Sequence, residues 1–147
     1  MQRTKALSNA ATAILIVSVL MLFKRHSLIA SHPAGLVVQG AAILLMLWAR
    51  VTFGLRSFHF SANTTAGSLV TTGPYRFVRH PIYSAVLIFI WTGVLANPIA
   101  TVSLALAVVG TLASAVRIWA EERFLNETYQ SYRSYAARTK RVIPYVV

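Results

Sequence analysis

The chain has 147 residues, of which 56% are hydrophobic and only 12% are charged, whereas a soluble domain of this size carries about 25% charged residues. So few charges cannot cover a water-facing surface, which predicts one integral membrane domain over residues 1–147. The net charge is +11, but the basic residues flank apolar runs, so the sequence argues against nucleic-acid binding and favours anionic lipid head groups as the counter-charge.

Four apolar segments predict four transmembrane helices. The first, residues 6–23, is too long for a signal-peptide core, which is typically about 7–15 residues. The second covers residues 34–55, the short third covers residues 82–96, and the fourth covers residues 98–120. Because only Asn97 separates the last two, and Asn-Pro favours a turn before a helix start, we expect a tight helical hairpin with a one-residue turn.

The tail after the fourth segment is amphipathic. Over residues 121–138, one helical face carries Leu125, Tyr129, Tyr132 and Ala136, with arginines on the other side. This pattern predicts an interfacial helix that continues out of the fourth segment. The fold class is therefore an all-α integral membrane protein with about four transmembrane helices.

The basic residues orient this bundle. With four spans, all but Lys24 and Arg25 of the 14 Lys and Arg residues fall on one side of the membrane, including Arg56 in the second loop. The excess of positive charge on cytoplasmic loops then predicts a multi-pass protein with both termini and the loop over residues 56–81 in the cytoplasm.

The fourth segment carries small residues on one face. Ser103, Ala107, Gly110 and Ser114 form this stripe, which continues through Arg117 to Glu121. Such a stripe lets another helix, or a flat ligand, approach the backbone closely. Taken by itself, the stripe favours helix packing alone over a ligand.

The three acidic residues, Glu121, Glu122 and Glu127, lie together. Glu121 and Glu122 fall where the fourth helix leaves the membrane, and a carboxylate at a helix C-terminus opposes the helix dipole. The pair therefore needs a cationic partner or full hydration. An i, i+4 ion pair between Arg117 and Glu121 would supply one; alternatively, a carboxylate binds a cationic ligand at the membrane boundary.

The stretch GPYRFVRHPIY leads into the third helix. Pro81 suits the first helical turn, His80 precedes it at the cap position, and Tyr83 follows within the turn. The free backbone N–H groups of this helix start, reinforced by Arg79, would form a small anion site. The alternative is that Arg76, Arg79 and Tyr83 are ordinary interfacial anchors.

Both clusters fall on the same side of the membrane, because the third helix begins there and the fourth ends there. A one-residue turn would make the two ends neighbours. We therefore expect Arg79 and His80 to face Glu121 and Glu122 across a small-residue groove. A zwitterion with a carboxylate and a cation fits this polarity, and S-adenosylmethionine, with its amino-acid group and sulfonium, is such a ligand.

These residues also resemble a known family. GPYRFVRHPIY, the apolar hairpin, EERFL and the tail YRSYAARTKRVIP are similar to the isoprenylcysteine carboxyl methyltransferases and the related phospholipid N-methyltransferases, over residues 70–144. The resemblance implies a membrane-embedded enzyme that uses S-adenosylmethionine near the cytoplasmic face. The residues that it assigns to the cofactor pocket are Tyr75, His80, Pro81, Tyr83, Glu121 and Glu122.

The resemblance extends to the tail. Arg138, Arg141 and Pro144 match the family's segment that folds back over the site. One departure is the pair Tyr129-Gln130, where the family often has an aromatic-glycine pair, so the turn there is expected to differ.

Methyl transfer from a sulfonium is an in-line displacement by an activated reagent, so it requires no metal and no covalent enzyme intermediate. This suits a chain without cysteine and without a Ser/His/Asp set. Arg79 or Arg76 would orient an anionic lipophilic substrate, such as an isoprenylcysteine-like carboxylate or a phospholipid-type acceptor. Two other functions stay open: a steroid-reductase-type enzyme that uses NADPH, and a non-catalytic membrane subunit or scaffold.

Overall fold

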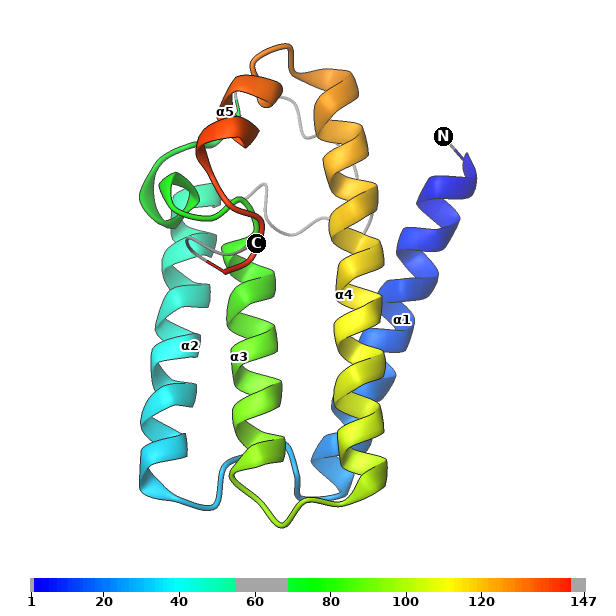
Figure 1. Ribbon diagram of the computed structural model, residues 1–147, viewed down its shortest axis with the longest axis vertical. Coiled ribbons are helices and arrows are strands. Elements are labelled where there is room, and N and C mark those ends of the chain that lie inside the picture. Colours follow the sequence, from blue (N-terminus) through cyan, green and yellow to red (C-terminus); the bar gives the residue numbers. More distant parts are fainter. Residues whose placement is uncertain (1, 55–68, 144–147) are drawn as a thin grey trace.

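The computed structural model describes residues 2–54 and 69–143 of the chain. In chain order the elements are α1 (Gln2–Lys24), α2 (Pro33–Phe53), the short 3-10 helix η2 (Gly73–Arg76), α3 (Pro81–Leu95), α4 (Thr101–Thr128) and α5 (Tyr132–Arg138) (Figure 1). No strand occurs in these residues, and the all-α prediction is confirmed. Some predicted features lie outside the described ranges: the last residue of the second segment, residue 55, most of the following loop, with Arg56, and Pro144.

Three helices, α1, α2 and α4, are long and apolar enough to cross a membrane. Their outward faces expose large hydrophobic side chains such as Leu44, Val51 and Leu112, which a lipid environment would cover. The apolar α3 has 15 residues, or about 22 Å of helix, which is less than the ~30 Å thickness of the hydrocarbon core. The four predicted apolar segments correspond to α1–α4, of which three reach the length of a span.

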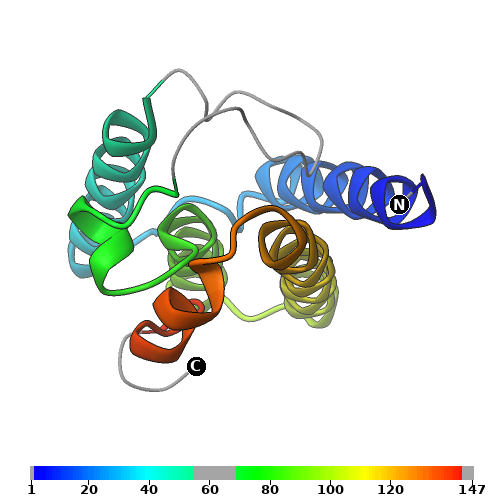
Figure 2. The same cartoon turned by 90° about the horizontal axis from the view of Figure 1, so that it is seen from above.

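The helices run alternately up and down (Figure 1). Packing is most extensive between α1 and α4 and between α2 and α3. Viewed from above, α3 lies between α2 and α4, and α1 flanks α4 (Figure 2). A buried apolar cluster of Leu22, Ile90, Val94 and Ala107 joins α1, α3 and α4.

The small-residue stripe of α4 is buried, and α1 packs on it. Ser103, Ala107, Gly110 and Ser114 are all buried. A Cβ at Gly110 would lie 3.5 Å from Leu15 Cδ1 and 3.7 Å from Ser18 Cβ, both on α1. Helix packing therefore accounts for the stripe. The expected small-residue groove between the third and fourth helices is wrong, because α1 occupies that face.

The connection between α3 and α4 is longer than predicted. α3 ends at Leu95 and α4 begins at Thr101, so the one-residue turn at Asn97 is wrong. The Asn97 amide donates to the carbonyl of Gly93, at 2.7 Å, and to that of Ile29, also at 2.7 Å. The side chain thus satisfies the end of α3 and ties it to the α1–α2 connection, while Pro98 follows in non-helical chain.

At the same end of the bundle, Gln39 of α2 fastens the α1–α2 connection to α3. Its side-chain amide donates to the carbonyls of Leu28 at 2.8 Å and Phe89 at 3.0 Å, and its oxygen accepts from Ala30 N–H at 3.0 Å. The connection is so close to α3 that a Cβ at Gly93 would lie 2.0 Å from the Leu28 carbonyl oxygen. Only glycine fits there.

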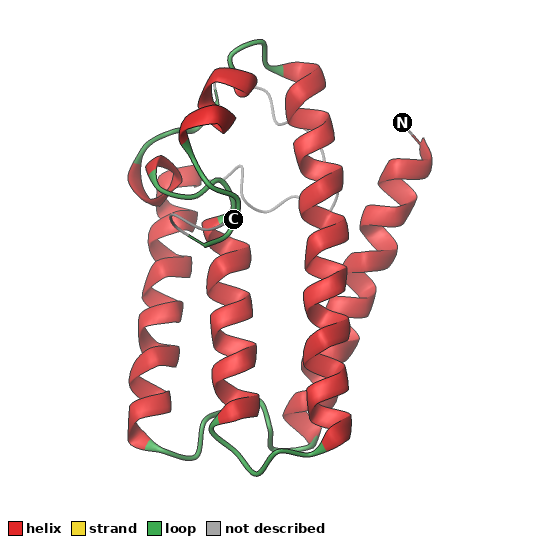
Figure 3. Ribbon diagram, in the orientation of Figure 1, coloured by secondary structure: helices red, strands yellow, loops and turns green. Residues whose placement is uncertain are grey.

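The tail is not one continuous helix, so the predicted amphipathic helix over residues 121–138 is wrong. α4 continues to Thr128, the chain becomes extended at Tyr129, and α5 begins at Tyr132 after a short loop (Figure 3). The break lets α5 turn back toward η2 and α3, where Tyr132 is 1% exposed. Burial of this aromatic ring against the bundle outweighs the local preference for a longer helix.

Candidate functional site

The start of α3 and the end of α4 meet at the upper end of the bundle (Figure 1). Arg79 Nε lies 2.9 Å from Glu122 Oε1. The imidazole of His80 lies between the two carboxylates, with Nδ1 3.7 Å from Glu121 Oε2 and Nε2 3.5 Å from Glu122 Oε1. The Tyr83 hydroxyl donates to Glu121 Oε1 at 2.5 Å. The structure thus brings together five of the residues singled out in the sequence.

Local structure explains why His80 points toward α4. Pro81 occupies the first helical position of α3 and is buried, and His80 caps the helix with non-helical backbone angles. The His80 ring is also buried, and its Nε2 has no hydrogen bond of good geometry. The Tyr132 hydroxyl is also buried and also has no hydrogen bond of good geometry. Buried polar atoms are normally hydrogen-bonded, so these two retain unused binding capacity.

Arg117 connects three helices at this site. Its Nη2 lies 3.0 Å from Glu121 Oε1, which is the i, i+4 pair that the sequence offered as one alternative. Its Nε donates to the Tyr83 hydroxyl at 2.6 Å, and its Nη1 donates to the hydroxyl of Thr12 on α1. Sequence reasoning missed Thr12. Arg117 itself could have indicated such a partner, because a guanidinium one turn inside an apolar segment requires several polar partners.

The tail after α5 covers the start of α3. The carbonyls of residues 140–142 accept, in order, from the backbone N–H of Arg79 at 2.7 Å, the backbone N–H of His80 at 2.9 Å, and the Ser84 hydroxyl at 2.6 Å. Pro81 has no N–H. The expected anion site of free N–H groups is therefore wrong for Arg79 and His80, whose amides are taken by the tail.

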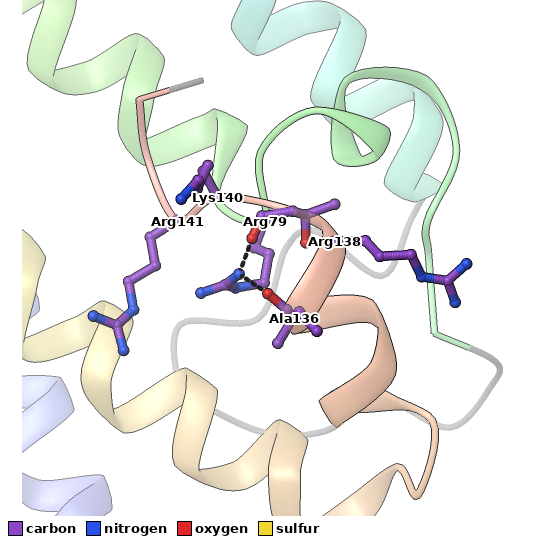
Figure 4. Close-up of a pocket in the computed structure, with 7 residues that line it drawn as sticks. Arg79, Ala136, Arg138, Lys140 and Arg141 are labelled. Carbon is purple, nitrogen blue, oxygen red and sulfur yellow. Dashed lines mark hydrogen bonds between the residues drawn. The ribbon is translucent and has the colours of Figure 1, made fainter. Parts of the chain in front are cut away.

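The Arg79 side chain also holds the tail. Its Nη1 donates to the carbonyls of Ala136, at 2.9 Å, and Thr139 (Figure 4). Together with residues 136–141 it lines a pocket of about 270 Å³. Figure 4 shows Arg141 extending toward α4, where its Nε lies 2.9 Å from Glu122 Oε2, while Arg138 points the other way.

The two remaining predicted residues, Tyr75 and Arg76, lie in η2. Tyr75 is buried against Phe53, with 5.6 Å between ring centroids, and its carbonyl accepts from the Tyr135 hydroxyl at 2.6 Å. Burial raises the pKa of Tyr135 to about 12, so this phenol stays protonated and donates at neutral pH. Arg76 is exposed and stacks on Phe77, 5.0 Å from the ring centroid, outside the carboxylate cluster.

Each carboxylate of the cluster has at least one arginine partner. Glu121 is paired with Arg117, and Glu122 with both Arg79 and Arg141. The side chain of Arg79 is 10% exposed and that of Arg141 is 55% exposed. Displacement of Arg141 by a cationic ligand therefore costs less free energy than displacement of Arg79, because the Arg141 side chain can return to water. In the described ranges no group of three His, Cys, Asp or Glu residues is placed to hold a metal ion.

The chain was compared with known protein families, curated proteins and solved structures. The phospholipid methyltransferase family matches residues 32–132. The cobalt-zinc-cadmium resistance protein CzcN of Cupriavidus metallidurans is 38% identical over 81 residues, which is 52% of this chain and 36% of that protein. The chain thus spans about a third of the length of this relative. No solved structure matches.

Proposed function

This chain belongs to the phospholipid methyltransferase family, and we propose that it is an integral membrane enzyme that transfers the methyl group of S-adenosylmethionine to a lipophilic acceptor. The observation that carries the proposal is the meeting of Arg79, His80 and Tyr83 with Glu121 and Glu122. All five lie inside the matched segment, at the end of the bundle where the apolar helices give way to polar chain.

The residues present fit a zwitterionic cofactor. Glu121 and Glu122 are only partly exposed, with side-chain exposures of 25% and 13%, so a cation that replaces Arg141 there is attracted more strongly than in water. The buried His80 Nε2 and Tyr132 hydroxyl lack good hydrogen bonds. Both can bind polar atoms of a ligand.

In this proposal Glu121 and Glu122 hold the positive groups of the cofactor. Tyr75, Pro81 and Tyr83 line the cofactor site, and His80 binds the carboxylate or the ribose. S-adenosylmethionine, when bound, supplies a methyl group already activated on a sulfonium.

The chain's own contribution is alignment and exclusion of water. Arg79 holds the tail over the start of α3, beside the proposed cofactor site, and so limits the access of water. Of the two arginines proposed to orient an anionic acceptor, Arg76 is exposed and the Arg79 guanidinium is already bonded to the tail and Glu122. Arg76 is therefore the better placed. A carboxylate acceptor needs no base, whereas an amine acceptor must arrive deprotonated, and the family favours a phospholipid-type acceptor.

The test compares two charge-neutralising variants on α4. Glu122→Gln should abolish binding of S-adenosylhomocysteine, measured by calorimetry on the purified protein in detergent. Glu127→Gln should bind normally, because Glu127 is half exposed and pairs with Arg123, at 3.3 Å, away from the cluster. Normal binding by a folded Glu122→Gln protein would remove the assigned role of that residue.

A second experiment identifies the acceptor. Purified protein is incubated with methyl-labelled S-adenosylmethionine and a lipid extract, and label is expected in a lipid fraction. Binding of NADPH instead of S-adenosylhomocysteine would favour a reductase. Binding of neither, together with cellular activity that survives changes at His80 and Glu121, would favour a scaffold.

A further inference from the structure

The first helix, α1, lies outside the segment that matches the family, which begins at residue 32. It nevertheless reaches the site through Thr12 and Arg117. We propose that Thr12 and Arg117 are positioning residues, which hold Tyr83 and Glu121 in the arrangement that binds the cofactor, so that α1 is part of the functional unit. This inference rests on the proposed function.

The geometry of Arg117 supports this role. A guanidinium is planar and rigid, so its nitrogens donate in fixed directions. Here each nitrogen contacts a different helix: Nε the Tyr83 hydroxyl on α3, Nη1 Thr12 on α1, and Nη2 Glu121 on its own helix, α4. Three contacts in three directions fix both the position and the rotation of the side chain. Arg117 is buried, at 8% exposure, so water cannot easily replace a lost partner.

Thr12 is itself held in a definite orientation. Its hydroxyl donates to the Ser8 carbonyl, one turn earlier on α1, at 2.8 Å. The hydroxyl hydrogen is therefore used within the helix, and the oxygen is left to accept from Arg117. The interaction runs in one direction, from the guanidinium to the hydroxyl, and a side chain without an oxygen at position 12 cannot replace it.

The effect reaches the carboxylates through Tyr83. Its hydroxyl accepts from Arg117 Nε and donates to Glu121 Oε1, so the position of Arg117 decides where this hydrogen points. If Arg117 loses Thr12, its guanidinium can rotate to find another acceptor for Nη1. Tyr83 and Glu121 then lose a fixed partner, although neither has been changed.

The experiment replaces Thr12 and leaves the cluster itself intact. Thr12→Val keeps the shape and removes the acceptor, and should weaken S-adenosylhomocysteine binding about five- to tenfold in calorimetry. Thr12→Ser keeps the hydroxyl and should restore binding to within about twofold of wild type. The control is Ser18→Ala, also on α1, because the Ser18 hydroxyl donates to the Ile14 carbonyl of its own helix at 2.9 Å. Thermal unfolding is measured for all three variants.

The outcomes separate this inference from the proposed function. Weak binding by Thr12→Val, with Thr12→Ser and Ser18→Ala near wild type at similar unfolding temperatures, supports the positioning role. Wild-type binding by Thr12→Val overturns it, and so does a loss that Ser18→Ala shares or that follows the unfolding temperature. If the wild-type protein does not bind S-adenosylhomocysteine, the proposed function fails first.

Discussion

At the scale of single residues, the site is a set of ion pairs with unequal access to water. Arg79 and Arg141 both bind Glu122, but the first is almost buried and the second is mostly exposed. A buried pair is costly to break, because the remaining charge loses its partner in a poorly solvated place. An exposed pair contributes little and exchanges readily. The same carboxylate thus has one permanent partner and one replaceable partner.

This difference predicts that Arg141 competes with a cationic ligand. Arg141→Gln should strengthen S-adenosylhomocysteine binding about two- to fivefold, because an exposed pair worth about 0.2–1 kcal/mol no longer has to be broken. Calorimetry at fixed ionic strength measures the change. Arg133→Gln, an exposed position on α5 with the same change in charge, is the control. Weaker binding by Arg141→Gln would show instead that Arg141 retains the ligand by holding the tail closed.

Some of these contacts could be predicted from the sequence. The proximity of His80 to Glu121 and Glu122 follows from topology, because two consecutive antiparallel helices must bring the start of one near the end of the other. The family resemblance implied that the tail with Arg141 folds back over the site, but the particular backbone contacts of Lys140 and Arg141 with the start of α3 could not be predicted. They join backbone groups about 60 residues apart and leave no side-chain pattern. The functional roles of the site residues stay predictions.

At the scale of elements, the lengths of the apolar segments predicted the helices. The local residue preferences did not predict where α4 begins and ends. Each of the four apolar segments became a helix. The predicted start of α4 was wrong because proline suits a connection as well as it suits the first turn of a helix, so Pro98 does not decide between them. The hydrogen bond that fixes the connection joins the Asn97 side chain to the carbonyl of Ile29, which is far away in sequence. The break at Tyr129 likewise depends on where Tyr132 is buried, which periodicity does not show.

The contact between α3 and the α1–α2 connection gives a stability prediction. Gly93→Ala should destabilise the protein by about 1–3 kcal/mol, because the new methyl group would overlap the Leu28 carbonyl. Gly40→Ala on α2 meets no atom within 4 Å and should be neutral or stabilising by up to about 1 kcal/mol. Thermal unfolding in detergent measures both. Equal unfolding temperatures would mean that the connection is free to move away from α3.

At the scale of the whole molecule, the chain has two unlike ends. One carries the α1–α2 and α3–α4 connections, and the other carries the site, α5 and the start of α1 (Figure 1). The basic residues predict that the second end faces the cytoplasm, and this orientation stays a prediction. The start of α1 and α5 lie at one end because the chain passes through four antiparallel helices, α1–α4, between them.

The absence of cysteine makes the orientation straightforward to measure. His32→Cys, on the α1–α2 connection, should react with a membrane-impermeant maleimide on intact cells. Ser134→Cys, on α5, should react only after the cells are permeabilised. Both positions are exposed, and the wild-type chain is the blank. The reverse pattern would place the site outside the cytoplasm.

The length of α4 sets the depth at which chemistry can occur. Its 28 residues make a helix of about 42 Å, roughly 12 Å longer than the hydrocarbon layer. If the hydrocarbon layer begins at Thr101, Glu121 and Glu122, about 30 Å farther along the helix, would lie at its opposite boundary, near the lipid head groups. In the proposed reaction, the acceptor would therefore have to present its nucleophilic atom at that level. Molecules whose reactive atom is buried midway along an acyl chain would be anchored out of reach, however well they dissolve in the bilayer.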